Sequence, residues 1–155
     1  MWEVLSPVMA KAILKDHGVI RFLHLDDGNT SIEVDVYNFK PGKHGFHIHE
    51  KGTVELGCDS LCAHYNPFNM THGDRTDKVR HIGDLGNIEV EEDGTCKMTF
   101  IDKLVKLKGK HSVVGRSVII HEDEDDLGRG VNDESLKTGN SGKRITCGKI
   151  IYTDN

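Results

Sequence analysis

Apolar and polar residues alternate in several short stretches of this chain. The clearest is Ser31–Phe39, where an apolar residue occupies every second position from Ile32 to Val36. Successive side chains of a strand point to opposite faces, so this pattern predicts a half-buried β-strand. Further strands are expected at Val8–Leu14, Val19–Leu25, Gly45–Glu50, Gly86–Val90, Thr95–Ile101, Leu104–Leu107, Ser117–His121 and Cys147–Tyr152.

Two long segments interrupt this pattern. Lys51–Asp84 has no sustained periodicity, and Glu122–Lys143 is rich in charged residues. Loops of this length within a compact domain are uncommon and are usually functional or disordered. Short strands, frequent turns and the lack of a periodic helix together predict an all-β sandwich or barrel with two functional loops.

The composition agrees with one β domain. The 155 residues include 17 glycines and 3 prolines, with 6% aromatic residues, so we expect a single domain over 1–155 with 1–7 as a short N-terminal extension. The net charge of −5 gives no support to nucleic acid or an anionic membrane as a partner. No run of about 18 apolar residues occurs, and Met1–Lys15 lacks signal-peptide features, so we expect a cytoplasmic protein without a membrane span.

The chain also has ten histidines, and histidine is the commonest metal-binding side chain. In the stretch GFHIHE, His47 and His49 share one face of a strand, with Cβ atoms roughly 7 Å apart, while Phe46 and Ile48 face the core. Two imidazoles at this spacing can converge on one metal ion. Alone, the pattern is weak, because such pairs are more often surface histidines.

Downstream residues strengthen the metal hypothesis. His64, His72 and His81 lie in the first long loop, and Asp84 follows three residues after His81. Three histidines and one aspartate form a tetrahedral zinc set of ordinary ligand types. The bound ion, and not a ladder of backbone hydrogen bonds, would then hold this loop in place. This explains why the loop has no regular pattern of apolar and polar residues.

A second set contains nitrogen ligands only. His47 and His49 combine with His121, at the end of an apolar strand, into a set that suits copper. If His64 bridges the two ions as an imidazolate, copper gains a fourth nitrogen ligand.

At this point the chain resembles the copper/zinc superoxide dismutase family, over almost its whole length from Ala10 to Tyr152. The resemblance rests on specific motifs in the same order and spacing. They are Gly45–Glu50 (GFHIHE), His64–Pro67 (HYNP), His72-Gly73, Arg80–Asn87 (RHIGDLGN), Gly115-Arg116 with His121, Asp125–Gly128 (DDLG), Lys137–Asn140 (KTGN) and Cys147-Gly148.

The resemblance implies an eight-stranded Greek-key β-barrel, a flattened sandwich. It assigns copper to His47, His49, His64 and His121, and zinc to His64, His72, His81 and Asp84. It also implies a Cys58–Cys147 disulfide, an Asp125 carboxylate that orients His47 and His72, and an Arg144 side chain that attracts the substrate. The residues expected to steer the substrate are Asp133, Glu134, Lys137 and Thr138.

The implied function is dismutation of superoxide to dioxygen and hydrogen peroxide by a redox-cycling copper ion, with a structural zinc ion bridged through His64. Arg144 and His64 would be the catalytic residues. The run Glu122–Asp126 is more acidic than the corresponding stretch of this family, which often has a lysine at the position of Asp123. We therefore expect a dismutation rate somewhat below that of the family. The alternative is a non-catalytic dismutase-like module, such as a copper chaperone domain or a metal buffer. Non-catalytic relatives typically lose a copper ligand or the arginine that guides the substrate, whereas this chain keeps every metal ligand and Arg144.

Some residues fall outside this scheme. A Cys/His zinc site at Cys58, Cys62 and His64 is a further possibility, whereas the resemblance leaves Cys62 and Cys96 free. The resemblance also implies a homodimer and a copper chaperone as partner, although Lys51 and Lys149 occupy positions where the dimer interface is usually apolar. We expect structural or surface roles for four histidines: His17, His24, His44 and His111.

Overall fold

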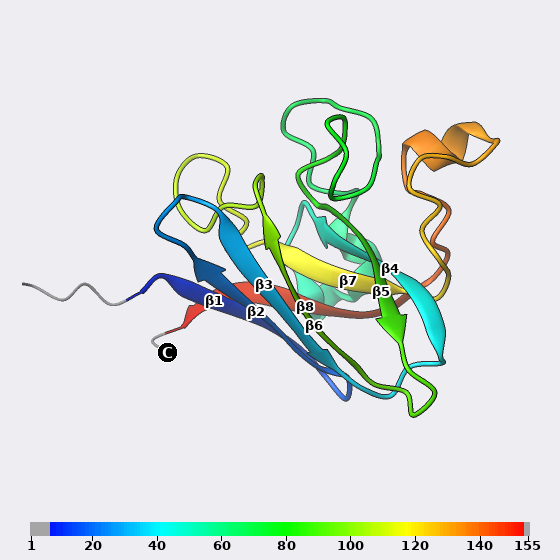
Figure 1. The fold of residues 1–155 in the computed structure, drawn as a ribbon, viewed down its shortest axis with the longest axis horizontal. Coiled ribbons are helices and arrows are strands. Elements are labelled where there is room, and N and C mark those ends of the chain that lie inside the picture. Colours follow the sequence, from blue (N-terminus) through cyan, green and yellow to red (C-terminus); the bar gives the residue numbers. More distant parts are fainter. Residues whose placement is uncertain (1–6, 154–155) are drawn as a thin grey trace, which may run out of the picture.

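The computed structural model describes residues 7–153, and all but Pro7 of the expected N-terminal extension lies outside them. Eight strands form one antiparallel sheet in the order β5-β4-β7-β8-β1-β2-β3-β6 (Figure 1). Their bounds are β1 Met9–Leu14, β2 Gly18–His24, β3 Thr30–Val36, β4 Gly42–His49, β5 Asp84–Val90, β6 Cys96–Asp102, β7 Ser117–His121 and β8 Arg144–Thr153.

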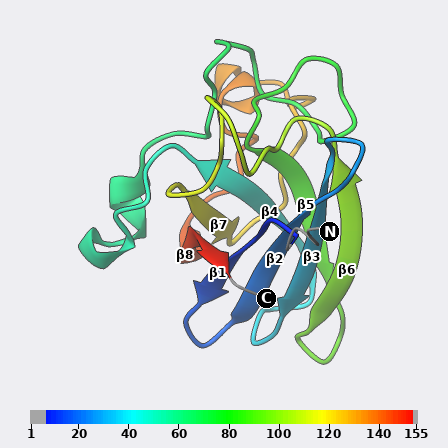
Figure 2. The same ribbon diagram turned by 90° about the vertical axis from the view of Figure 1, so that its left-hand side faces the viewer.

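The strand order identifies a Greek-key barrel. β3 is followed in sequence by β4, and β6 by β7, yet neither pair is adjacent in the sheet, so both connections cross the barrel. The edge strands β5 and β6 approach one another, which nearly closes the sheet on itself (Figure 2). The predicted all-β, eight-stranded barrel is therefore confirmed.

The core lies inside this barrel. In β3, buried and partly exposed residues alternate strictly, as the sequence pattern predicted. In β7, all five residues are buried, and in β4 the last six are, because the long loops cover the outer faces of these two strands. The inward side chains include Phe22, Ile32, Phe46, Ile48, Ile88, Val118 and Ile150.

One predicted strand is wrong. Leu104–Leu107 makes no ladder, although Val105 and Leu107 are fully buried. The Asp102 carboxylate accepts hydrogen bonds from the backbone N–H groups of Leu104 (3.1 Å) and Val105 (2.9 Å), which turns the chain at the end of β6. These apolar residues therefore cover one end of the core instead of extending the sheet.

Several predicted boundaries also shift. The strand expected to reach Phe39 ends at Val36, and Asn38 adopts a left-handed conformation with φ of 68°. Asp84, expected at the end of the first long loop, is instead the first residue of β5. Strand β8 begins at Arg144, before the predicted start at Cys147. Each of these residues is thereby fixed at the end of a hydrogen-bonded strand.

The two long loops rise on the same side of the barrel (Figures 1 and 2). They contain only short 3₁₀ segments: η1 Val54–Leu56, η2 Cys58–Leu61 and η3 Asp133–Leu136. The predicted disulfide is present, and it ties Cys58 of the first loop to Cys147 of β8. Within the described part of the chain, no helix has the length and apolar character that crossing a membrane requires.

Candidate metal centre

Strand β4 presents His47 and His49 outward, while Phe46 and Ile48 pack in the core. The neighbouring strand β7 ends at His121. The register shifts between Gly45 and His47 and again after Ile120, and such irregularities re-aim side chains near functional sites. The ring centroids of His47 and His121 lie 4.9 Å apart, and those of His49 and His121 lie 5.7 Å apart.

The first loop adds His64 to these three residues. Backbone hydrogen bonds from Tyr65 N to Ile48 O (2.8 Å) and from Glu50 N to Ala63 O (2.9 Å) hold the loop on β4. The His64 ring stacks on His47 at a centroid distance of 3.9 Å. We call His47, His49, His64 and His121 the four-histidine set. Each offers one ring nitrogen, and these atoms lie within 4.8 Å of one another.

A second cluster surrounds the Asp84 carboxylate. Its Oδ1 atom lies 2.9 Å, 2.8 Å and 3.0 Å from the Nδ1 atoms of His64, His72 and His81. Its Oδ2 atom accepts hydrogen bonds from the backbone N–H groups of Gly73 and His81. We call the buried residues His64, His72, His81 and Asp84 the Asp84 set; His64 belongs to both sets.

The ring nitrogens of these histidines show whether metal ions fit. Nδ1 of His47 and Nε2 of His49 and His121 are buried without a hydrogen-bond partner. The other nitrogen of each ring faces an acceptor: the Asp125 carboxylate for His47, Cys62 O (2.8 Å) for His49 and Gly142 O (3.1 Å) for His121. Each ring N–H is thus directed away from the set, which leaves a lone pair on the unpaired nitrogen. Buried nitrogens rarely lack partners, so their convergence fits a bound cation.

Asp125 connects the two sets. Its two carboxylate oxygens accept hydrogen bonds from Nε2 of His47 and Nε2 of His72, the latter at 2.7 Å. Asn87 of β5 holds Asp125 in place, since its side chain pairs with both the N–H (2.7 Å) and the C=O (3.0 Å) of Asp125. Asn87 ends the RHIGDLGN motif, but this role cannot be read from the motif, because it depends on contact between segments far apart in sequence.

Burial dominates the protonation of the four-histidine set. It lowers the pKa of His47 and His49 well below the ordinary value of 6.5, and neighbouring histidines lower both further. Burial also lowers the pKa of His121 to about 4. Neutral imidazoles are the form that binds metal, so this environment keeps the set ready for a cation.

The Asp84 set behaves differently. Burial lowers the pKa of His72, but hydrogen bonds with Asp125 and Asp84 outweigh burial and raise that pKa to about 9. Burial likewise raises the pKa of Asp84, yet hydrogen bonds from the three histidines hold it well below its usual range. Without a metal ion, the Asp84 and Asp125 carboxylates therefore stabilise the protonated form of His72.

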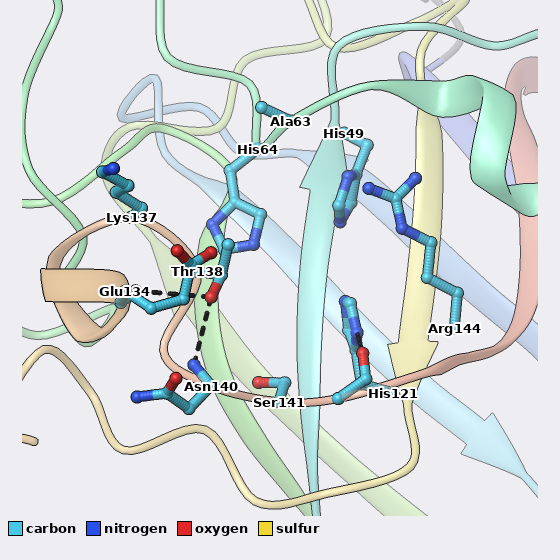
Figure 3. Close-up of a pocket in the computed structure, with 11 residues that line it drawn as sticks. His49, Ala63, His64, His121, Glu134, Lys137, Thr138, Asn140, Ser141 and Arg144 are labelled. Atoms are coloured by element: carbon cyan, nitrogen blue, oxygen red, sulfur yellow. Dashed lines mark hydrogen bonds between the residues drawn. The ribbon is translucent and has the colours of Figure 1, made fainter. Parts of the chain in front are cut away.

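A cavity of about 590 Å³ opens onto the four-histidine set. Figure 3 shows His49, His64 and His121 on its walls, with Arg144 beside His49 and His121. The Arg144 guanidinium donates to the backbone carbonyls of Cys58 (2.8 Å) and Cys62 (2.7 Å), and burial lowers the pKa of this group. The Cys58–Cys147 disulfide and these two hydrogen bonds fix the cation at the cavity wall.

Three of the four expected steering residues line this cavity: Glu134, Lys137 and Thr138. Thr138 is held by hydrogen bonds to Glu134 O (3.3 Å) and from Asn140 N (3.2 Å), as Figure 3 shows. Asp133 is not among the lining residues, although it begins η3. The cavity therefore has two cations on its walls: Arg144, which two backbone carbonyls hold in place, and Lys137, which is exposed.

Comparisons with known proteins agree with this geometry. The family model for copper/zinc superoxide dismutase matches residues 16–150. The chain belongs to the copper/zinc superoxide dismutase family. It is 49% identical over 153 residues to a superoxide dismutase [Cu-Zn] of Paramecium bursaria Chlorella virus 1, covering 97% of this chain and 81% of that protein.

Two further relatives extend this comparison. An extracellular superoxide dismutase [Cu-Zn] of Brugia pahangi is 46% identical over 169 residues, covering 99% of this chain and 85% of that protein. Among solved structures, the clock protein EA4 matches with a TM-score of 0.89 and 37% identity, covering 97% of this chain and 98% of that chain. The protein is therefore an enzyme that dismutes superoxide, with copper and zinc as cofactors, and not a non-catalytic metal-binding module.

The state of the cysteines excludes the alternative zinc site at Cys58, Cys62 and His64. Cys58 is bonded to Cys147, and the Cys62 thiol is exposed, so the Cys/His zinc site does not form. Cys62 and Cys96 are both free, as expected. Cys62 serves the site through its carbonyl oxygen instead, which accepts hydrogen bonds from His49 and Arg144. No residue-type signal in the sequence reveals such backbone acceptors.

Proposed function

We propose that the four-histidine set holds the copper ion, that the Asp84 set holds the zinc ion and that His64 bridges them. The observation that carries this assignment is the convergence of three buried, unpaired ring nitrogens, from His47, His49 and His121. An all-nitrogen set suits copper, whereas three histidines with one carboxylate are ordinary zinc ligands.

Bound copper supplies the one-electron acceptor and donor that dismutation requires, while zinc supplies charge without redox chemistry. The protein side chains then manage protons and orientation. Nδ1 of His64 faces Asp84 at 2.9 Å, so Nε2 is the atom on which His64 would hold one of the two protons that peroxide formation consumes, and water would supply the other. Asp125 keeps His47 and His72 oriented through their Nε2 atoms.

Arg144 binds the anionic substrate in this proposal. Two carbonyl acceptors fix its guanidinium at the cavity wall, which leaves the charge and the remaining N–H groups available to an anion. Lys137 and Thr138 extend the cationic and polar path into the cavity, while Glu134 on its wall and the neighbouring Asp133 of η3 shape the surrounding field. Local charge must guide superoxide here, because the net charge of the chain is −5.

The acidic run Glu122–Asp126 opposes this guidance. Glu122, Asp123 and Glu124 are exposed, so their charges face the solvent from which the anion arrives. We expect the D123K variant to react faster than the parent at low salt, by about two- to threefold, and equally at high salt, since salt screens exposed charges. A D123K rate that matches the parent at low salt would remove this explanation.

We also propose a cytoplasmic homodimer that receives copper from a copper chaperone. Exposed apolar side chains on β1 and β8, including Ile13, Ile151 and Tyr152, support an interface on this side of the barrel. The exposed Lys51 and Lys149 weaken that surface, and one relative is named extracellular. Sedimentation over a range of protein concentrations tests the dimer, and cell fractionation tests the location.

The decisive experiment measures dismutation rate together with copper and zinc content of the same sample. The proposal predicts about one ion of each kind per chain and copper-dependent turnover. H121A is expected to lose copper and activity but to retain zinc, because His121 belongs only to the four-histidine set. H111A is a matched control, since His111 lies outside both sets. Normal activity in H121A would overturn the assignment.

A further inference from the structure

A second cavity, of about 390 Å³, shares two lining residues with the substrate cavity. Ala63 and His64 line both, but the remaining walls differ. The polar walls of the second cavity include Asn66, Lys110 and Arg116. Apart from His64, no residue that lines it takes part in the proposed dismutation chemistry, so most of this space is left without a role.

Arg116 is held rigidly at the wall of this cavity. Its guanidinium stacks on the Tyr65 ring, 3.7 Å from the centroid, and donates to Ser112 O through Nε (3.3 Å) and to Glu50 O through Nη1 (2.9 Å). Within the described residues, Nη2 of Arg116 has no hydrogen-bond partner. A fixed planar cation with a free N–H group is a preorganised donor for an oxyanion.

The charges around the cavity are not balanced by ion pairs. Among residues 7–153, neither Arg116 nor Lys110 lies within 4 Å of a carboxylate oxygen. Glu50 also lines the cavity, but it is exposed to solvent. From residue 103 to residue 121 the chain carries no acidic residue, while Lys103, Lys106, Lys108, Lys110 and Arg116 give five positive charges in a protein of net charge −5.

An aromatic side chain lies next to this cavity. The ring of Phe68 packs edge-on against His111, which lines the cavity, at a centroid distance of 4.7 Å. Phe68 is 58% exposed, so its other surface is available to a ligand. The volume exceeds what a single inorganic oxyanion fills and falls in the range of small-molecule sites.

We propose that this cavity binds a small oxyanion of the phosphate class, either free or as the end group of a small organic phosphate. Arg116 supplies the fixed donor, Lys110 supplies a mobile charge that closes over the anion, and Asn66 and His111 complete the wall. The site is separate from Arg144, so it can be occupied while superoxide reacts in the other cavity.

The test uses the reduced, diamagnetic enzyme with both metals bound, with NMR of the His111 ring protons as the readout. Inorganic phosphate should shift these signals in a saturable way. In K110Q the dissociation constant should rise by about tenfold, because a charge-assisted hydrogen bond is lost. Lys108 is exposed in the same segment but does not line the cavity, so K108Q should change affinity by less than twofold.

Two further arms complete the experiment. R144Q should abolish anion binding in the substrate cavity yet leave the His111 response intact, which separates the two sites. Phenyl phosphate binding more tightly than inorganic phosphate would indicate an organic ligand stacked on Phe68, and equal binding would indicate free phosphate. The proposal is overturned if phosphate gives no saturable response, or if K108Q weakens binding as much as K110Q does.

Discussion

The two halves of the metal centre are built by different means. The four-histidine set rests mainly on strands: His47 and His49 on β4 and His121 on β7, in the same sheet. The Asp84 set is built mainly from a long loop, which supplies His64, His72 and His81, and only Asp84 belongs to a strand. Strand register positions the first set, whereas side-chain hydrogen bonds position the second.

This difference shows where each set obtains its stability. A barrel strand is held by ladder hydrogen bonds on both sides and by a packed core, so its side-chain directions do not depend on a ligand. A long irregular loop lacks these constraints and needs tethers. The tethers present here are the Cys58–Cys147 disulfide, the Arg80–Asp102 ion pair and the Asp125 carboxylate. Each can be removed separately to test the comparison.

Removal of the disulfide should have the largest effect. Its cysteines are 89 residues apart, and the chain-entropy model assigns such a crosslink about 4–5 kcal/mol of stability. Urea unfolding of a C58S/C147S variant should show this loss, with amide exchange rising first in residues 50–64. C96S is the control, since Cys96 is free and buried. Equal loss of protection across β3 and the first loop would contradict the idea of a local tether.

The buried ion pair should come next. Arg80 and Asp102 are almost fully buried, with Nη1 and Oδ1 2.7 Å apart, and Arg80 also donates to the carbonyls of Arg75, His81 and Ile82. R80Q leaves the buried Asp102 carboxylate without its counter-ion, although two backbone N–H groups still donate to it, and such a loss typically costs about 3–5 kcal/mol. The exposed Arg21–Glu33 pair offers a matched control, and R21Q should cost less than about 1 kcal/mol. If R80Q and R21Q lost similar amounts of unfolding free energy, burial of the ion pair would not explain its contribution to stability.

The Asp125 link should have a smaller effect, confined to metal binding. D125N keeps the size of the side chain but removes the charge that orients the His72 and His47 rings. Loss of such an outer contact typically weakens metal affinity by about 10- to 100-fold. Competition with a chelator should show a larger loss for zinc than for copper, because two other copper ligands are fixed by β4 and β7. An equal loss for both metals would argue against this comparison.

A separate set of effects concerns the metal-free protein alone, whose stability depends on pH. His121 has a pKa lowered to about 4 by burial, so the stability linked to it is complete above about pH 6.5 and lost as the pH falls toward 4. His72 has a pKa raised to about 9 by its carboxylate partners, so its contribution is complete below about pH 6.5 and lost as the pH rises through 9. Urea unfolding of chelator-treated protein should thus show stability falling in both directions from neutral pH.

Single substitutions show which histidine causes the loss of stability on the acidic limb and on the alkaline limb of the stability–pH curve. H121Q should flatten the acidic limb and leave the alkaline limb, while H72Q should do the reverse. The same acidic limb in H121Q and the parent protein would mean that other buried groups, such as His47 and His49, account for all of it.

Much of the barrel was predictable from local pattern. The alternation in Ser31–Phe39 and the GFHIHE stretch depends on backbone geometry alone, which is why β3 and β4 were located within a few residues. Leu104–Leu107 misled the prediction because a short apolar run has the same composition whether it pairs in a sheet or covers the end of a core. Its fate depends on Asp102, whose carboxylate binds the following N–H groups.

The sequence by itself determined the strand faces, the types of metal-binding residues and, through its motifs, the family. Those properties depend on the alternation of side chains and on ligand chemistry, both of which are local. Only the tertiary structure decided which nitrogen of each histidine is free, since backbone carbonyls of Cys62 and Gly142 and the Asn87-held Asp125 accept the other N–H. It also brought Arg116, Tyr65 and Lys110 around one cavity. These contacts join segments far apart in the chain, and the hydrogen-bonded ladders and core packing fix their distances.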